Sequence, residues 1–186
     1  MYPEFTTERL LLRRWNSQDV VPFALINEDP RVMEFMPRVL TRLESKQWID
    51  DLEQHFEKHG FGLWAVEHLK TQRLIGYTGI HIPRFASLLP CVEIGWRFAF
   101  DVWGNGYATE AARAALKFGF EQAKLQEIRS FTVPANERSW RVMQRIGMNH
   151  DPTRSFHHPA LPADHPLSYH VLFRLTREDW LAQKRR

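Results

Sequence analysis

The chain has 186 residues, of which 44% are hydrophobic and 13% aromatic, enough to bury a substantial core. Its 25 basic and 22 acidic residues are mixed along the sequence, so the net charge of +3 permits an anionic cofactor without indicating a nucleic-acid partner. Cys91 is the only cysteine, which excludes an internal disulfide and a cysteine-rich metal site and is consistent with a reducing compartment.

The first half of the chain predicts strands and helices that belong to one domain. We expect this domain to cover residues 1–186, with a core at about 8–176, and to be cytoplasmic, because no apolar run approaches the ~20 residues of a membrane span and no signal segment opens the chain. Ser17 is a suitable N-cap, and Thr41 with Glu44 has the capping-box pattern. The expected elements are a strand at 8–15, a helix at 18–28, a helix from the capping box to Gly60, and a hairpin of strands at 61–67 and 74–80.

The second half adds a crossover between two strands. Residues 91–100 alternate, which predicts a strand with one apolar face (Val92, Ile94, Trp96, Phe98, Phe100) and an opposite face that carries Glu93, Gly95, Arg97 and Ala99. A helix at 108–123 and a strand at 127–133 follow, and such a β-loop-α-β unit predicts a parallel strand pair. A short capped helix that ends at Gly147, a surface loop at 151–166 and a strand at 168–175 complete a mixed α+β domain.

The glycine-rich segment Trp103–Thr109 leads directly into the predicted helix. A diphosphate is bound well by backbone N–H groups that converge at a helix N-terminus, and glycines allow that approach. A hairpin turn at Asn105-Gly106 is disfavoured because the following residues are helical, and a P-loop would need a Lys-Ser/Thr pair that is missing. A dinucleotide-binding loop stays an alternative because Glu127 lies about twenty residues further on, although Thr109 replaces its third glycine.

Four segments in order resemble the GCN5-related N-acetyltransferase (GNAT) superfamily, in the branch of the ribosomal-protein N-terminal acetyltransferases. They are Thr7–Arg13, Glu93–Trp96, Trp103–Ala111, and Asn136 with Ser139 before Gly147-Met148, and the resemblance covers nearly the whole chain. It implies the GNAT fold: a central, mostly antiparallel twisted sheet, a splayed parallel strand pair that admits pantetheine, and helices on both faces. Acetyl-CoA is the implied co-substrate.

The resemblance also implies the residues that contact acetyl-CoA. The superfamily's usual basic or Gln residue at the start of the loop is Trp103 here, so phosphate contacts are expected from backbone amides and Thr109. Phe98 and Phe100 are expected to offer main-chain hydrogen bonds to pantetheine. The expected cofactor-binding residues are Phe98, Phe100, Trp103, Gly104, Asn105, Gly106, Tyr107, Ala108, Thr109 and Asn136.

Acyl transfer to an amine requires a proton acceptor for the ammonium and a proton donor for the departing thiolate. Glu93 is the candidate base, and an ordinary exposed or salt-bridged glutamate is the alternative. Ser139 is the candidate proton donor, because it matches a serine that this branch of the superfamily places near the sulfur of CoA. The alternative is that Ser139 is an ordinary serine in the first turn of a helix. Asn136 is expected to cap the same helix.

Three other groups of polar residues need an interpretation. Arg138, Arg141 and Arg145 recur at helical spacing and suit either the outer phosphate of the cofactor or a solvated face. His55 and His59 are interpreted as a surface pair, because the helix lacks the rest of a metalloprotease motif, and no metal is expected. The histidines of segment 150–170 suit either an acceptor pocket or a surface loop.

These features predict an N-acetyltransferase that moves an acetyl group from acetyl-CoA directly to a primary amine. The acceptor is a small-molecule or peptide amine, with no nucleic-acid or membrane partner. A non-catalytic acyl-CoA-binding module and a dinucleotide-binding oxidoreductase are the alternatives. The acceptor depends on the loops at 31–42 and 151–166, and neither its identity nor the choice between monomer and homodimer follows from the sequence.

Overall fold

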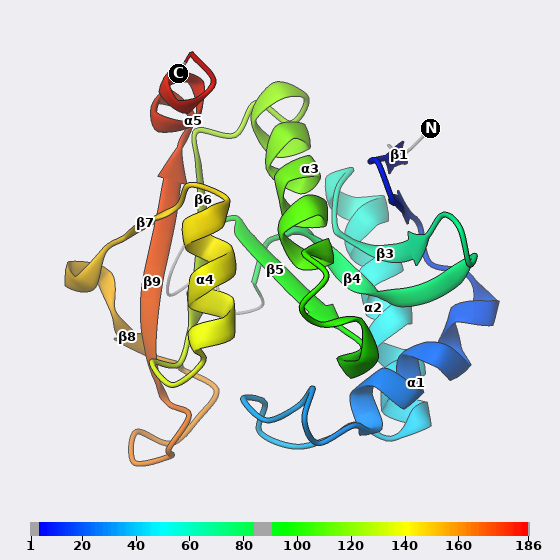
Figure 1. Ribbon diagram of the computed structural model, residues 1–186. Helices are drawn as coiled ribbons and strands as arrows, with labels where there is room; N and C mark the ends of the chain where they lie inside the picture. Colours follow the sequence, from blue (N-terminus) through cyan, green and yellow to red (C-terminus); the bar gives the residue numbers. More distant parts are fainter. Residues whose placement is uncertain (1–3, 84–90, 186) are drawn as a thin grey trace.

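One twisted sheet forms the centre of the molecule (Figure 1). The computed structural model describes residues 4–83 and 91–185. Within these residues the strands form a nine-stranded sheet in the order β1-β2-β3-β4-β5-β6-β9-β7, and β8 also pairs with β9. The strands are β1 (Phe5–Thr6), β2 (Leu10–Arg13), β3 (Leu63–His68), β4 (Arg73–His81), β5 (Glu93–Phe98), β6 (Glu127–Thr132), β7 (Asn149–His150), β8 (Phe156–His157) and β9 (Tyr169–Thr176).

Helices cover both faces of this sheet. They are α1 (Val20–Glu28), α2 (Arg42–His59), α3 (Tyr107–Glu121), α4 (Glu137–Arg145) and α5 (Arg177–Gln183), with 3-10 turns η1 (Ser17–Asp19), η2 (Phe100–Val102) and η3 (Pro152–Arg154). On one face the Tyr77 ring packs against Phe23 of α1 and Trp48 of α2, with ring centroids 6.1 and 4.8 Å away. On the other face Gly119 lets α3 approach so closely that a Cβ there would lie 2.6 Å from Ile128 Cδ1. The predicted mixed α/β class, with a mostly antiparallel sheet and helices on both faces, is confirmed.

The helix ends follow from local sequence. Thr41 and Glu44 form the predicted capping box of α2, and Gly60 ends that helix with a left-handed φ of 75°. The start of α1 differs from the prediction. Asn16, rather than Ser17, accepts the capping hydrogen bond, from Gln18 N–H, and the chain makes the turn η1 before α1 begins at Val20. Among the described residues, none of the helices has the length and apolar content needed to span a membrane.

Strand boundaries differ most from the prediction around β5. The strand ends at Phe98, because Ala99 N–H makes a last bond to Ile75 O and the chain then turns into η2, which Trp103 N–H closes on Phe100 O. Phe100 is therefore 39% exposed and does not continue the apolar face of the strand. The expected strand at 8–15 is limited to β2, and the short β1, β7 and β8 were not expected.

The junction of β5 and β6 is the parallel pair that the crossover predicts. The register pairs only Glu93 with Arg129, although each strand has six residues. Arg129 N–H donates to Val92 O at 2.9 Å, and Ser130 Oγ donates to Ile94 O at 2.9 Å. Beyond these contacts β5 stays with β4 while β6 stays with β9, so the two strands splay apart below α3 and α4 (Figure 1).

A half-buried histidine links α2 to the end of β4. His55 Nδ1 lies 2.9 Å from Phe61 O, and Nε2 accepts from Ile82 N–H at 3.1 Å, which assigns the neutral tautomer with its proton on Nδ1. Burial is the main cause that lowers the pKa of His55 to about 4.

His55 should make the stability of the fold depend on pH. The unfolded chain binds this proton near pH 6.5 and the native state only near pH 4, so native stability should fall as the pH drops through this window and level off below it. We expect a loss of about 1 kcal/mol between pH 7 and pH 5, discounted for partial exposure. Urea denaturation at both pH values measures it. His55→Gln keeps a donor and an acceptor but does not titrate, so an equal loss in that variant would exclude His55 as the source.

Candidate active site

The glycine-rich loop has a backbone conformation that glycine adopts more easily than other residues do. Gly104 and Gly106 both have left-handed φ values, 81° and 82°, and Gly106 is the N-cap residue of α3. Asn105 holds the turn from inside, because its Nδ2 donates to Val102 O at 3.0 Å and to Trp103 O at 3.2 Å. A Cβ on Gly104 would meet nothing within 4 Å, so the space beside this residue is open.

The backbone amides of this loop are available for a ligand. Among the described residues, none of the N–H groups from Gly104 to Thr109 donates to a protein acceptor, and the first that does is Glu110 N–H, which bonds Gly106 O at 3.0 Å. These groups sit at the positive end of the α3 dipole. Thr109 is only 9% exposed, which leaves the backbone as the main polar surface here. The loop therefore fits a diphosphate.

An arginine from the start of the chain lies beside the loop. Glu110 receives hydrogen bonds from Thr7 Oγ1 at 2.6 Å, from Arg9 N–H at 3.0 Å and from Arg9 Nε at 2.7 Å. The Arg9 guanidinium then stacks 4.5 Å from the centre of the Tyr107 ring, and a Cβ on Gly106 would lie 3.7 Å from Arg9 Nη2. Sequence reasoning missed this cation, because nothing local connects Arg9 with a loop nearly a hundred residues later.

Burial alone raises the pKa of Glu110, but the hydrogen bonds from Thr7 and Arg9 outweigh it and hold that pKa below its usual value. The carboxylate is 17% exposed and the Arg9 side chain 40% exposed. Glu110 is therefore an ionised link between the first strands and the start of α3.

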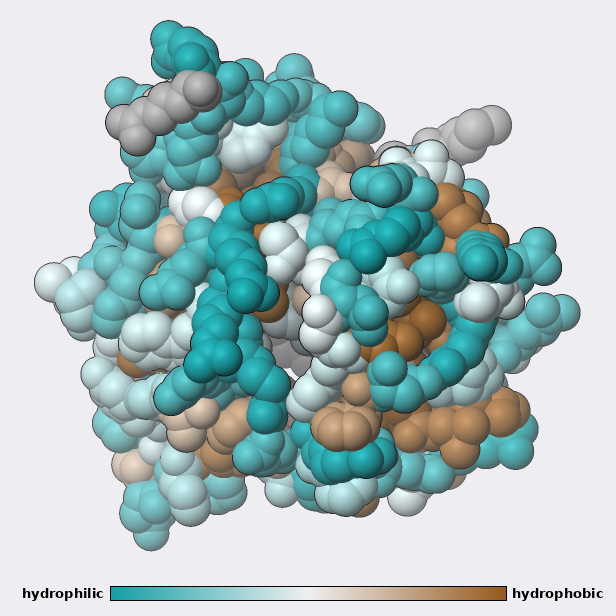
Figure 2. Space-filling view, in the orientation of Figure 1, coloured by the Kyte–Doolittle hydropathy of each residue, from teal (hydrophilic) through white to brown (hydrophobic). Residues whose placement is uncertain are grey.

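Trp103 connects the loop to β5 and α4. Its Nε1 donates to Phe98 O at 2.9 Å, and its ring lies 5.0 Å from that of Phe100. The Arg138 guanidinium from the first turn of α4 lies 4.7 Å from the Trp103 ring centre and forms an ion pair with Glu34. The face of the molecule that carries α4 has a hollow near its middle, with the hydrophilic side chains of α4 along one side (Figure 2).

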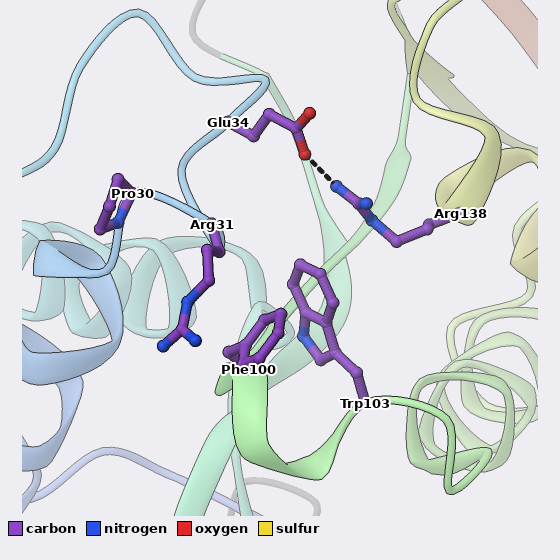
Figure 3. Close-up of a pocket in the computed structure, with 6 residues that line it drawn as sticks. All are labelled: Pro30, Arg31, Glu34, Phe100, Trp103 and Arg138. Atoms are coloured by element: carbon purple, nitrogen blue, oxygen red, sulfur yellow. Dashed lines mark hydrogen bonds and ion pairs between the residues drawn. The ribbon is translucent and has the colours of Figure 1, made fainter.

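These side chains line a pocket of about 390 Å³ between the segment after α1, the turn η2 and α4 (Figure 3). Its lining residues are Pro30, Arg31, Glu34, Phe100, Trp103 and Arg138. Arg31 lies 3.8 Å over the Phe100 ring and is bonded to Asp29 at 2.6 Å. Of the three arginines at helical spacing on α4, Arg138 is the one that lines the pocket. Arg141 forms an exposed ion pair with Glu137, and the backbone carbonyl of Arg145 accepts a hydrogen bond from the Arg113 side chain.

The peptide groups of β5 point alternately to its two neighbours. Val92 O and Ile94 O face β6, whereas Gly95 O accepts from Thr78 Oγ1 of β4 at 3.0 Å. By the same alternation the peptide groups of Trp96 and Phe98 face the gap where β6 has turned away. Trp103 Nε1 already donates a hydrogen bond to Phe98 O. Of the two backbone polar groups of Phe98, the N–H is therefore the one available to a ligand.

Glu93 lies at the closed end of the same gap. Its Oε2 is 3.0 Å from Nε2 of His81, its cross-strand neighbour, and the two side chains are 15% and 24% exposed. Five residues of extended strand, about 17 Å, separate Glu93 from Phe98 and the loop beyond it. The structure therefore places Glu93 and the loop at opposite ends of β5, a separation suited to a long flexible ligand arm.

Asn136 and Ser139 lie at the start of α4, where β6 ends. Asn136 caps the helix as predicted, with Oδ1 accepting from Ser139 N–H at 3.2 Å, and its Nδ2 donates to Thr132 Oγ1 at 3.0 Å. The Ser139 hydroxyl has no hydrogen-bond partner among the described residues. Arg138 next to it reaches Trp103, so this turn of α4 lies against the loop.

His158 and His170 lie at the start of β9 with two phenylalanines, whereas His150 of β7 stacks on Phe173. The His170 ring stacks 5.7 Å from Phe156 and lies 5.9 Å from Phe131 and 5.2 Å from His158. Burial lowers the pKa of His158 and of His170, and the charge of Glu93 opposes the shift at His170. The register places His170 on the same face of the sheet as Glu93, because Glu93 pairs with Arg129 and Phe131 pairs with Leu172. No group of three or more His, Cys, Asp or Glu in residues 4–83 and 91–185 is arranged to hold a metal ion.

Comparisons with known proteins identify the class to which this fold and loop belong. Residues 9–149 match the acetyltransferase (GNAT) domain family, and the chain belongs to that family. YkkB of Bacillus subtilis, an uncharacterized protein, is 32% identical over 151 residues, which cover 81% of this chain and 87% of YkkB. The uncharacterized N-acetyltransferase YnaD of the same organism is 28% identical over 94% of this chain and 98% of YnaD.

Solved structures agree with this assignment. A GNAT-family acetyltransferase from Bacillus anthracis superposes with a TM-score of 0.79 and 26% identity, over 95% of this chain and 99% of that one. The ribosomal-protein-S5-alanine acetyltransferase from Vibrio fischeri shares the fold, with a TM-score of 0.75 at 21% identity over 96% and 98% of the two chains. The protein is an acyltransferase, as predicted, and the dinucleotide-binding alternative is excluded. Acetyl-CoA is the acyl donor of this family.

The link between Glu110 and Arg9 should contribute measurably to stability. Glu110→Gln replaces an ionised acceptor of several hydrogen bonds with an amide whose NH₂ group opposes Arg9, so we expect a loss of about 1–3 kcal/mol in the free energy of unfolding at pH 7. Urea denaturation measures it, and the difference from wild type should shrink as the pH falls below 4.5 through the lowered pKa of Glu110.

The matched control is Glu137→Gln, which breaks the exposed ion pair with Arg141 and should cost less than about 0.5 kcal/mol. Equal losses in the two variants would show that Glu110 acts only as a surface charge.

Proposed function

We propose that the protein transfers the acetyl group of acetyl-CoA directly to a primary amine in a ternary complex. The row of free N–H groups from Gly104 to Thr109 at the N-terminus of α3 carries the proposal, since it matches the cofactor's diphosphate. Arg9 beside Gly106 supplies a positive side chain that the loop itself lacks at Trp103. The uncharacterized N-acetyltransferase YnaD, similar over nearly its whole length, supports the same donor.

In this proposal the pantetheine arm enters the gap between β5 and β6. The N–H group of Phe98 and the peptide groups of Trp96 are free to hydrogen bond with the amides of the arm, because β6 pairs with β9 here. Trp103 and the first turn of α4 with Asn136 form the walls. The arm then brings the thioester toward the end of β5 that carries Glu93.

The chemistry needs one proton acceptor and one proton donor. Glu93 takes a proton from the ammonium, directly or through a water, and the amine nitrogen then attacks the thioester carbonyl carbon. The carbon–sulfur bond breaks as the tetrahedral intermediate collapses, and the Ser139 hydroxyl donates a proton to the thiolate, whose conjugate pKa is ~8.5. The nitrogen loses its second proton in the same step, and this proton returns to the Ser139 oxygen, so the products are a neutral amide and the free thiol of CoA. His81 positions Glu93 through the bond at 3.0 Å.

The only cysteine is poorly suited to a covalent acyl-enzyme. Burial is the main cause that raises the pKa of the Cys91 thiol to about 11, so the thiolate is scarce at neutral pH. Direct transfer from acetyl-CoA to the amine is the simpler mechanism.

Gly106→Asp tests the cofactor site. The new carboxylate would project from the phosphate loop, so we expect the affinity for acetyl-CoA, measured by isothermal titration, to fall roughly tenfold or more. Gly60→Asp is a matched control, because Gly60 also has a left-handed φ, of 75°, with nothing within 4 Å of a Cβ. Both variants should lose comparable stability, and only Gly106→Asp should lose affinity. Unchanged binding in Gly106→Asp would contradict the assignment of the loop.

Glu93→Gln tests the base. The amide keeps the shape and a hydrogen-bonding oxygen but cannot accept the proton, so kcat should fall about a hundredfold or more while the affinity for acetyl-CoA stays the same. Thiol release over a broad panel of amines is the assay, with mass spectrometry of the product. Ser139→Ala is the comparison: it should lower kcat but keep the acidic limb of the pH–rate profile, which Glu93→Gln should abolish.

If the Glu93→Gln variant had the same pH–rate profile as wild type, another group would have to be the base. Binding of acetyl-CoA without thiol release on any amine would favour the alternative of a non-catalytic acyl-CoA-binding module.

A further inference from the structure

An arginine on β5 lies on the same face as Glu93 and has no role in the chemistry described so far. Arg97 Nη1 donates to Asn27 Oδ1 at 2.6 Å. Its guanidinium lies 5.5 Å from the centre of the Tyr77 ring and 5.9 Å from that of Trp48. Arg97 is half-buried, so it is accessible from this side of the sheet, where α1 and α2 pack.

The charge of Arg97 is not neutralised within the described part of the chain. The other strand arginines each form an ion pair with a carboxylate: they are Arg13, Arg73, Arg129 and Arg174. Arg97 forms none, and its hydrogen-bond partner is a neutral amide. A guanidinium has five N–H donors in a planar fork, and one bond to Asn27 leaves most of them unused. The site therefore has excess positive charge and free donors.

A buried polar network holds this arginine in position. Asn27 and Ser45 are both 0% exposed, and Asn27 Nδ2 donates to Ser45 Oγ at 3.0 Å. Leu40 N–H donates to Asn27 O at 3.1 Å, which ties the segment before α2 to the same point. Burying polar groups is costly unless they are bonded, so this network across α1 and α2 gives Arg97 a preorganised geometry.

Open space separates Arg97 from Glu93. Gly95 lies between them on the same face, and a Cβ there would meet nothing within 4 Å. Four residues of extended strand place the Cα atoms of Glu93 and Arg97 about 13 Å apart. A ligand can therefore lie over Gly95 with a cationic amine toward Glu93 and a group of opposite charge toward Arg97.

We propose that Arg97 binds an anionic group of the acceptor, so that the substrate is an amine connected through several bonds to a carboxylate or phosphate. Rigid donors and excess positive charge favour such a group over a neutral one, and they disfavour polycationic amines by like-charge repulsion. The inference rests on the proposed function, because it assumes that Glu93 marks the position of the amine. Arg97 is a specificity-determining residue for the acceptor and takes no part in proton transfer.

The test compares acceptors that differ only in the anionic group. Nα-acetyl-lysine is paired with its carboxamide, and glucosamine 6-phosphate with glucosamine, with spermine and a simple alkylamine that lacks an anionic group as further acceptors. Thiol release gives kcat and KM for each. The acidic member of at least one pair should be used about ten- to a hundredfold more efficiently, mainly through KM. The pair that shows the effect distinguishes a carboxylate from a phosphate.

Variants of Arg97 assign the preference to this side chain. Arg97→Gln should reduce the preference to within about twofold while leaving the affinity for acetyl-CoA unchanged, and Arg97→Lys, which keeps the charge, should retain part of it. Lys117→Gln removes one positive charge from an exposed position on α3 and should behave as wild type. If Arg97→Gln does not fold, the wild-type pairs and Arg97→Lys decide the question.

The outcomes separate this proposal from the proposed function. Thiol release with equal efficiency on acidic and neutral acceptors, or a preference for spermine, would overturn the role of Arg97 and leave the acetyltransferase assignment intact. Failure of every amine to release thiol would overturn the proposed function and this inference with it.

Discussion

The contact between β5 and β6 is the constraint on which the candidate site depends. The register joins the strands only at Glu93 and Arg129, where Arg129 N–H donates to Val92 O and Ser130 Oγ donates to Ile94 O, so they are held together at one end only. Each strand has an antiparallel neighbour on its other side, so the pair separates without loss of the sheet. The separation leaves backbone polar groups of β5 facing a gap in the middle of the molecule, and such groups require a partner.

This geometry arranges the parts of the site along one strand. Glu93 with His81 stands at the closed end, Gly95 leaves open space, and Arg97 follows on the same face. The chain leaves the strand through η2 and reaches the amides of Gly104–Thr109 at the other end. A ligand with a diphosphate, a long arm and a reactive end fits this order.

Local sequence signals predicted much of the fold and the position of the loop. The helix α2 runs from its capping box to Gly60, and the alternation of 91–100 and the helical residues after Gly106 predicted the crossover. These signals depend on caps, periodicity and glycine conformations, which act within a few residues. The same local reasoning extended β5 to Phe100 and missed β7 and β8, because strand ends and two-residue strands are decided by pairing with distant segments.

The sequence by itself determined the family resemblance, the order of the longer strands and helices, and the glycine-rich loop with Glu93 upstream of it. Only the tertiary structure decided the partners of the charged groups: Arg9 beside the loop, Arg138 on Trp103, and Arg97 on a buried amide. The physical reason is sequence distance. Each of these contacts joins segments tens of residues apart, and charge pairing and burial are properties of the folded arrangement that no local pattern of residues encodes.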